Sequence, residues 1–242
     1  MEIHYVFLLC LPLVAFLYAA VGHGGASGYL AIMALFSFSP EVMKPTALLL
    51  NLFVAGISFF HYAKSGHFNW KLFLVFALLS VPLSFLGGTI NVDTEIYKLI
   101  LGIILLFAIA KMLGLFGQQP ESKKEIKWFP GLLIGGSIGF FSGLIGIGGG
   151  IILSPAILLL RWGNVKEAAA VSALFIWVNS ASGMTGQLYS GVTIPTYAWW
   201  FVLVAVIGGF LGGYVGSRME NKLLRYTLAV VLILASVKLI FT

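Results

Sequence analysis

The stretch that decides the fold is Gly143-Leu144-Ile145-Gly146-Ile147-Gly148-Gly149-Gly150, followed by Ile151-Ile152-Leu153-Ser154-Pro155. It is a glycine-rich turn between two apolar segments. A shorter copy, Val21-Gly22-His23-Gly24-Gly25-Ala26-Ser27-Gly28, lies near the N-terminus. Glycine permits left-handed backbone angles and a close approach of neighbouring segments. Both stretches are therefore predicted to be sharp turns between helices.

The composition is typical of a membrane protein. The chain has 242 residues, of which 60% are hydrophobic and 9% charged, with a mean hydropathy of +1.04. A soluble domain carries about 25% charged residues. Several uncharged runs approach the roughly 20 residues that span a bilayer. The sequence thus predicts an all-α polytopic membrane protein. Its net charge of +6 is assigned to cytoplasmic loops and not to a nucleic-acid partner.

The apolar segments follow one another in a regular order. Ten can be delimited, at residues 3–21, 26–38, 45–62, 70–90, 96–116, 129–146, 150–161, 168–188, 195–216 and 222–241. The second and seventh cover only about 20 Å each, less than the hydrocarbon core. A polar connector at 117–127 separates a first transmembrane repeat, 1–116, from a second, 128–242.

An internal repeat relates these two halves. Gly22, Gly24 and Gly25 match Gly146, Gly148 and Gly149 at an offset of 124 residues. Further matches at an offset of 125 join 65–66 to 190–191 and 86–88 to 211–213. Because each half holds five segments, an odd number, the two halves are predicted to be inverted in the membrane.

The distribution of lysine and arginine supports a particular topology. If both short segments complete hairpins, one side of the membrane receives 11 basic residues and the other receives 3, namely Lys44, Lys98 and Lys238. If the short segments are re-entrant loops, the division becomes 7 against 7. The positive-inside rule favours hairpins, with the connector in the cytoplasm and both termini outside. The two glycine turns then approach each other from opposite faces.

The turns are candidates for an anion site that needs no charged side chain. The helix that follows each turn directs free backbone N–H groups and a positive dipole end towards it. Asn51, Ser172 and Asn179 are expected to complete the shell, because buried amides and hydroxyls need partners. The candidate substrate-binding residues are Gly22, His23, Gly24, Gly25, Ser27, Asn51, Gly146, Gly148, Gly149, Gly150, Ser154, Ser172 and Asn179.

Other interpretations of the same residues stay open. The glycines also suit close helix packing, which is the expected function of those at 208–209 and 212–213. His23 suits either proton transfer or a hydrogen bond to a neighbouring carbonyl. A channel would share these features. An intramembrane serine hydrolase built on Ser27 and His61 lacks a convincing catalytic pair, so an enzyme is not expected. Neither is a cofactor or a metal site, since Cys10 is the single cysteine.

The run 143–155, followed by Lys166-Glu167-Ala168-Ala169-Ala170-Val171-Ser172, resembles the TauE/SafE sulfite exporter family. The resemblance extends over essentially the whole chain, although Ala26, Ala31 and His23 depart from the family's pattern in the first half. It implies a bacterial cytoplasmic (inner) membrane secondary transporter for sulfite or a small organosulfonate. Alternating access, in which one repeat rocks against the other, is the expected mechanism. Export of an anion down an inside-negative potential needs no coupling ion.

Overall fold

The computed structural model describes residues 5–20, 24–113, 115, 122–216, 233 and 237. Nine helices lie within these ranges. They are α1 (Tyr5–Ala20), α2 (Ala26–Leu35), α3 (Pro40–Lys64), α4 (Trp70–Thr89), α5 (Thr94–Met112), α6 (Trp128–Ile145), α7 (Gly150–Leu159), α8 (Val165–Tyr189) and α9 (Ala198–Gly216). The tenth predicted segment, 222–241, lies outside the described residues apart from positions 233 and 237.

The helices confirm an all-helical, multi-pass membrane protein. Among the described residues, five helices are long and apolar enough to cross a bilayer, namely α3, α4, α6, α8 and α9. The apolar helices α1, α2 and α7 are shorter, as expected for α2 and α7. Large hydrophobic side chains cover the outer surface, among them Leu9 at 76% and Phe129 at 73% exposed. Such a surface is suited to lipid and not to water.

Two helices begin earlier than hydrophobicity alone predicts. α3 begins at Pro40 and not at residue 45, because proline is favoured in the first turn and Ser39 supplies the extended residue before it. α8 begins at Val165 and not at 168. A capping box explains this start, since Asn164 accepts a hydrogen bond from the Glu167 N–H while the Glu167 carboxylate accepts one from the Asn164 N–H.

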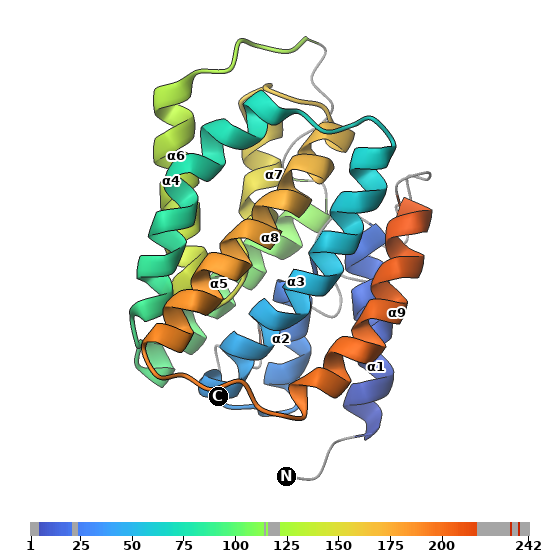
Figure 1. Ribbon diagram of the computed structural model, residues 1–242, viewed down its shortest axis with the longest axis vertical. Helices are drawn as coiled ribbons and strands as arrows, with labels where there is room; N and C mark the ends of the chain where they lie inside the picture. The colour runs from blue at the N-terminus through green and yellow to red at the C-terminus, as the bar shows by residue number, and fades with distance from the viewer. Residues whose placement is uncertain are drawn as a thin grey trace.

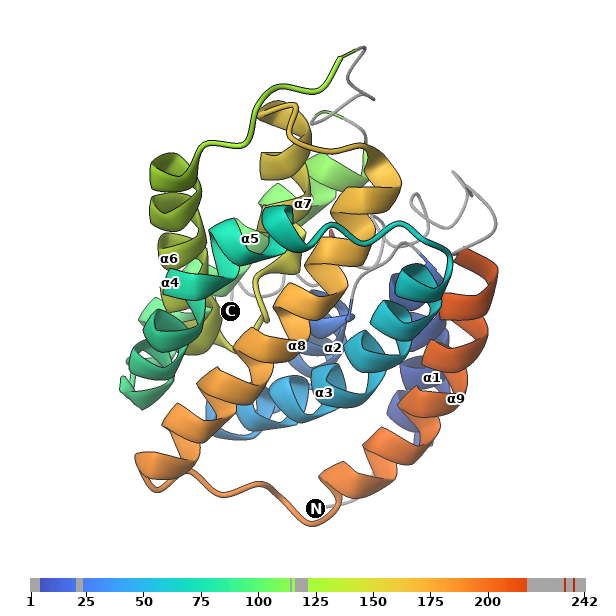
Figure 2. The same cartoon turned by 45° about the horizontal axis from the view of Figure 1, so that its top comes forward.

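The long helices α3 and α8 form the centre of the molecule. Each has 25 residues, and Pro40–Lys64 matches Val165–Tyr189 position by position at an offset of 125. The two helices pack against each other and run in opposite directions (Figure 1). α4 and α6 pack together on one side of this pair, while α1 and α9 pack together on the other, an arrangement also visible in Figure 2.

Glycine stripes bring these outer pairs close together. On α6, Gly135, Gly139 and Gly143 lie one turn apart, and a Cβ on any of them would collide with a backbone carbonyl of α4. On α9, Gly208 and Gly212 meet carbonyls of α1 in the same way. Small residues at such spacing let membrane helices approach to backbone contact. The expected packing function of the glycines in α9 is therefore confirmed.

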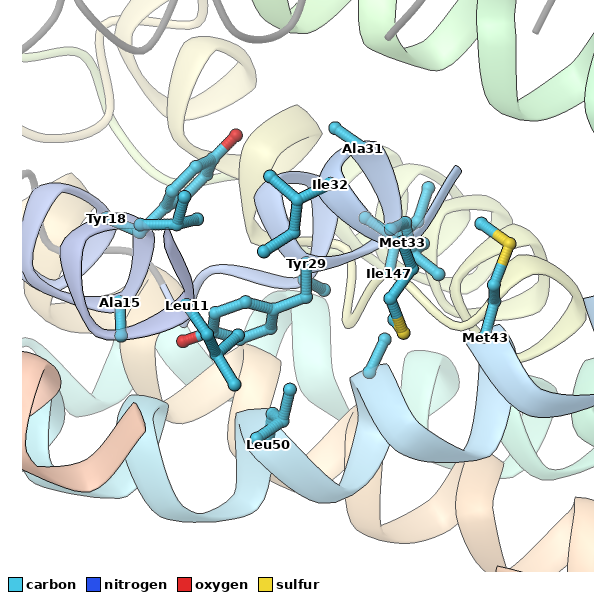
Figure 3. Packing of buried hydrophobic residues seen from close by; sticks show 14 of the residues in the cluster. Leu11, Ala15, Tyr18, Tyr29, Ala31, Ile32, Met33, Met43, Leu50 and Ile147 are labelled. Carbon is cyan, nitrogen blue, oxygen red and sulfur yellow. The ribbon is translucent and has the colours of Figure 1, made fainter. Parts of the chain in front are cut away.

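The short helix α2 lies in the protein interior. Nine of its residues, Ala26 to Ala34, are buried. Figure 3 shows the cluster around it, in which Tyr29 points from α2 towards Leu11 and Leu50. Ile147 of the second glycine turn belongs to the same cluster and lies beside Met33 in Figure 3. The turn of the second half thus packs into the core of the first half.

Candidate functional site

The two glycine turns adopt the left-handed backbone that their sequence predicts. In the second turn, Gly146, Gly148 and Gly149 have φ of +87°, +77° and +79°. In the first turn, Gly25 has φ of +98°. Any residue with a Cβ would be strained there. The backbone itself therefore requires glycine at these four positions.

Each turn leads into a helix whose first N–H groups lack a side-chain cap. Gly25 is the N-cap of α2 and Gly149 is the N-cap of α7, and a glycine has no side chain that could accept a hydrogen bond from the first helix N–H groups. The first N–H groups of any helix have no acceptor within the helix, and the dipole adds partial positive charge there. The starts of α2 and α7 consequently offer donors suited to an anion.

The two turns meet at the same pair of side chains. A Cβ built on Gly24 would lie 2.9 Å from Asn51 Oδ1 and 2.8 Å from Ile176 Cγ2. A Cβ built on Gly148 would lie 2.7 Å from Asn51 Nδ2 and 2.7 Å from Ile176 Cγ2. Asn51 of α3 and Ile176 of α8 are themselves equivalent at the offset of 125. The turns thus approach one centre from two sides.

The remaining neighbours of the turns follow the same correspondence. The Cβ on Gly24 would also lie 2.8 Å from Ala55, and the Cβ on Gly148 would lie 2.9 Å from Ser180 Oγ. Ala55 and Ser180 are equivalent positions of α3 and α8. The centre is therefore built alike by both halves, since α3 contributes the polar Asn51 and the apolar Ala55, and α8 contributes the polar Ser180 and the apolar Ile176.

Asn51 links the second turn to α8. Its fully buried amide donates hydrogen bonds to Ser180 Oγ at 3.0 Å and to the Ile147 carbonyl at 3.4 Å. Its Oδ1 has no hydrogen-bond partner among the described residues. A buried polar atom left without a partner costs about 1–3 kcal/mol, which favours occupation of this point by a ligand or water.

Two serines place further unpartnered hydroxyls beside the second turn. Ser172 and Ser142 are buried, and neither hydroxyl has a partner in the described part of the chain. The Ser172 carbonyl oxygen lies 3.3 Å from a Cβ built on Gly150, and the Ser142 Cβ lies 3.5 Å from one built on Gly149. The sequence indicated Ser172 and Ser180 as hydroxyls near the turns, but Ser142 was missed. The position of Ser142, one turn before Gly146, was the available signal.

Three other predicted site residues have their polar groups engaged elsewhere. Ser27 donates to the Tyr18 hydroxyl at 2.9 Å, and Ser154 donates to the Gly150 carbonyl at 3.1 Å. Asn179 donates to the Phe175 carbonyl at 2.8 Å and accepts from Ser80 at 2.6 Å. These bonds brace the helices around the centre. A direct contact of the three residues with a substrate stays a prediction.

Gly22 and His23 lie outside the described residues, so the contacts of the first turn are known only from Gly24 onwards. Gly25 packs against the ring of Tyr29, while Gly146 packs against the backbone of Lys44. No cluster of three or more metal-ligating side chains occurs among the described residues.

The two ends of the central helix pair differ. At the lower end in Figure 1, where α3 begins and α8 ends, lies a cavity of about 400 Å³ whose walls include Lys44 and Gln187. The equivalent positions at the other end are Ala169 and Tyr62. There they are buried in an apolar cluster with Ala170, and Phe68 packs against it. Lys44 and Gln187 therefore line a cavity, while the equivalent pair at the other end is packed. A further pocket at that other end, of about 540 Å³, is lined mainly by apolar residues such as Phe59 and Trp177.

Apolar helices around a buried polar centre, where two glycine turns meet, are the arrangement expected of a secondary transporter. The comparison with known proteins agrees. The pattern of the sulfite exporter TauE/SafE family matches residues 7–239. The chain belongs to this family.

Named relatives share nearly the whole length of the chain. A "probable membrane transporter protein" of Sinorhizobium fredii is 37% identical over 233 residues, which is 94% of each chain. One of Methanocaldococcus jannaschii is 30% identical over 257 residues and 96% of each chain. A third, from Bacillus subtilis, is 28% identical and covers 84% of this chain and 82% of its own. No solved structure matches. The protein is thus a membrane transporter.

Proposed function

We propose that the protein moves sulfite or a small organosulfonate across the cytoplasmic membrane, and that the anion binds between the two glycine turns. The observation that carries this proposal is the meeting of Gly24 and Gly148, next to two uncapped helix starts, at the side chain of Asn51. Backbone N–H groups suit an oxyanion whose charge is spread over several oxygens. The choice of sulfur rests on the family's name.

The two halves are inverted with respect to each other in this proposal. The opposite directions of α3 and α8, visible in Figure 1, support it. The helix packing also supports it. α4 and α9 are equivalent in the two halves, as are α1 and α6, and each helix of the pair α4 and α9 packs on a helix of the other half: α4 on α6, and α9 on α1. Such a relation places the site where the repeats meet, near the middle of the membrane.

Alternating access then exchanges the two ends. In the described conformation Lys44 and Gln187 line a cavity, while the equivalent residues Ala169 and Tyr62 are packed together. Equivalent helices that adopt each other's packing would close the first end and open the second. The buried centre at Asn51 would be reached from one side at a time.

The orientation follows from the basic residues, with 11 on the side of the connector and 3 on the other. The connector is then cytoplasmic, the hollow end faces outward and both termini lie outside. An inside-negative potential favours export of an anion by about 2.3 kcal/mol per charge and 100 mV. Coupling of anion transport to proton transfer at His23 is the alternative source of driving force.

The test is uptake of labelled sulfite and labelled organosulfonates by proteoliposomes that contain the purified protein. We expect saturable uptake that accelerates when unlabelled substrate is loaded inside. A flux that rises linearly with concentration and shows no such acceleration would identify a channel. If no sulfur oxyanion moves at all, the proposed function is wrong.

A further inference from the structure

Lys44 lines the cavity at the lower end, and the transport mechanism proposed above assigns it no function. Lys44 lies in the second turn of α3, in a helix of membrane length, and the residue is partly buried. A lysine near a helix end can reach the membrane interface, so the partial burial of Lys44 in the cavity wall is what distinguishes it. In the described part of the chain, no carboxylate forms an ion pair with Lys44. Its ammonium instead lies 4.7 Å from the centre of the Tyr97 ring.

Gln187 also lines the cavity and carries a buried polar group. The side chain is 3% exposed, and neither its Nε2 nor its Oε1 has a partner among the described residues. Burial of an amide without hydrogen-bond partners costs free energy, because the amide loses its hydrogen bonds to water and gains none in the protein. A cation and an unused amide donor that line the same cavity form a site for an anion.

The cavity is aligned with the central site. Lys44 precedes Asn51 by seven residues on α3, and Gln187 follows Ser180 by seven residues on α8. Seven residues are almost two full turns, so each pair shares a helix face and is separated by about 10 Å along the axis. Asn51 and Ser180 are bonded to each other at 3.0 Å. Because α3 and α8 are antiparallel, Lys44 and Gln187 lie at the same end.

The cavity also touches the second glycine turn. The backbone of Lys44 packs against Gly146, so that a Cβ there would lie 3.1 Å from Lys44 Cα. The Tyr97 hydroxyl, whose ring faces the Lys44 ammonium, donates to the Ile145 carbonyl at 3.2 Å. Direct contacts therefore join Lys44 and Tyr97 to the second glycine turn.

We propose that this cavity is a second anion-binding site, in which Lys44 and Gln187 receive an oxyanion before or after it occupies the centre between the glycine turns. The second site extends the proposed function. Its place on the path of the anion rests on that function, whereas binding of the anion at Lys44 and Gln187 does not. Glu41, an exposed carboxylate one turn before Lys44, also lines the cavity. Its negative charge opposes anion binding, so its removal strengthens the site while removal of Lys44 weakens it.

The experiment measures occupancy without measuring transport. In a Cys10→Ser background, Val192→Cys places one thiol on the cavity wall. The rate of its modification by a methanethiosulfonate reagent is followed at increasing concentrations of methanesulfonate, an inert organosulfonate. We expect saturable protection of the thiol. Asn91→Cys, at another point of the wall, serves the same purpose if the first variant is not monodisperse in detergent.

Lys44→Met and Gln187→Leu should each raise the half-protecting concentration about tenfold, the effect of one lost hydrogen bond to a charged group. Glu41→Gln should lower it. Lys98→Met is the matched control, because Lys98 lies on α5, pairs with Glu95 at 3.1 Å and is absent from the cavity wall. It should leave the parent value unchanged.

Lack of protection in the parent, or equal half-protecting concentrations in the parent, Lys44→Met and Gln187→Leu, would overturn the second site. Sulfite flux in proteoliposomes is measured separately on the same proteins. Protection that depends on Lys44 without any flux would refute the proposed transport and retain the site. Sulfite flux, combined with protection that is the same with and without Lys44, would refute the second site and retain the proposed transport.

Discussion

Gly148→Ala perturbs the centre where the two turns meet. The left-handed backbone at this position, with φ of +77°, would strain an alanine by about 1–2 kcal/mol. The added methyl group would also lie 2.7 Å from Asn51 Nδ2 and Ile176 Cγ2. Such overpacking costs typically about 1–3 kcal/mol more. The methyl group would push Asn51 away from the second turn, so we expect sulfite flux to fall to background.

The matched control is Gly66→Ala. Gly66 has φ of +76°, so an alanine there suffers the same backbone strain, but no atom lies within 4 Å of the added Cβ. The thermal stability of both variants in detergent and their sulfite flux in proteoliposomes are compared with the parent. Gly66→Ala should lose stability only through the backbone and keep its flux. Equal stability and equal flux in the two variants would refute the argument that the turns meet at a site.

Further predictions test the other parts of the mechanism. Asn51→Leu removes the hydrogen bonds to Ser180 and Ile147 and should lower sulfite flux by about tenfold or more; parental flux would show that the amide is dispensable. The pair Tyr62→Cys and Ala169→Cys, in the Cys10→Ser background, should cross-link the packed end on oxidation and stop flux until reduction, whereas undiminished flux in the cross-linked protein would contradict alternating access. Ser122→Cys should react with impermeant thiol reagents only from the cytoplasmic side of cells, and labelling from outside would overturn the proposed orientation.

Much of the fold can be read from the sequence because local chemistry determines it. Glycine is strongly favoured where φ is positive, so the run 146–150 predicts the turn, and α7 begins at Gly150 as expected. Hydrophobicity locates the helices but not all their ends. It misses the first turn of α8, since Lys166 and Glu167 are charged and are placed in the helix by the capping box with Asn164.

The candidate site is less predictable because its residues meet across the two halves. Asn51 could be singled out as a costly buried amide, but its bond to Ser180 joins positions 129 residues apart. Lys44 and Gln187 carry no local pattern that distinguishes them from packing or interfacial residues. Their character follows from burial and from missing partners, which only the packed structure reveals.

The most direct test of the central claim is to locate a bound anion. Crystals of the protein grown with selenite, an analogue of sulfite, would reveal selenium through its anomalous scattering. The account predicts a peak between the starts of α2 and α7, beside Asn51 and the turns at Gly24 and Gly148. Peaks confined to exposed lysines, or a centre that stays empty at saturating selenite, would contradict it.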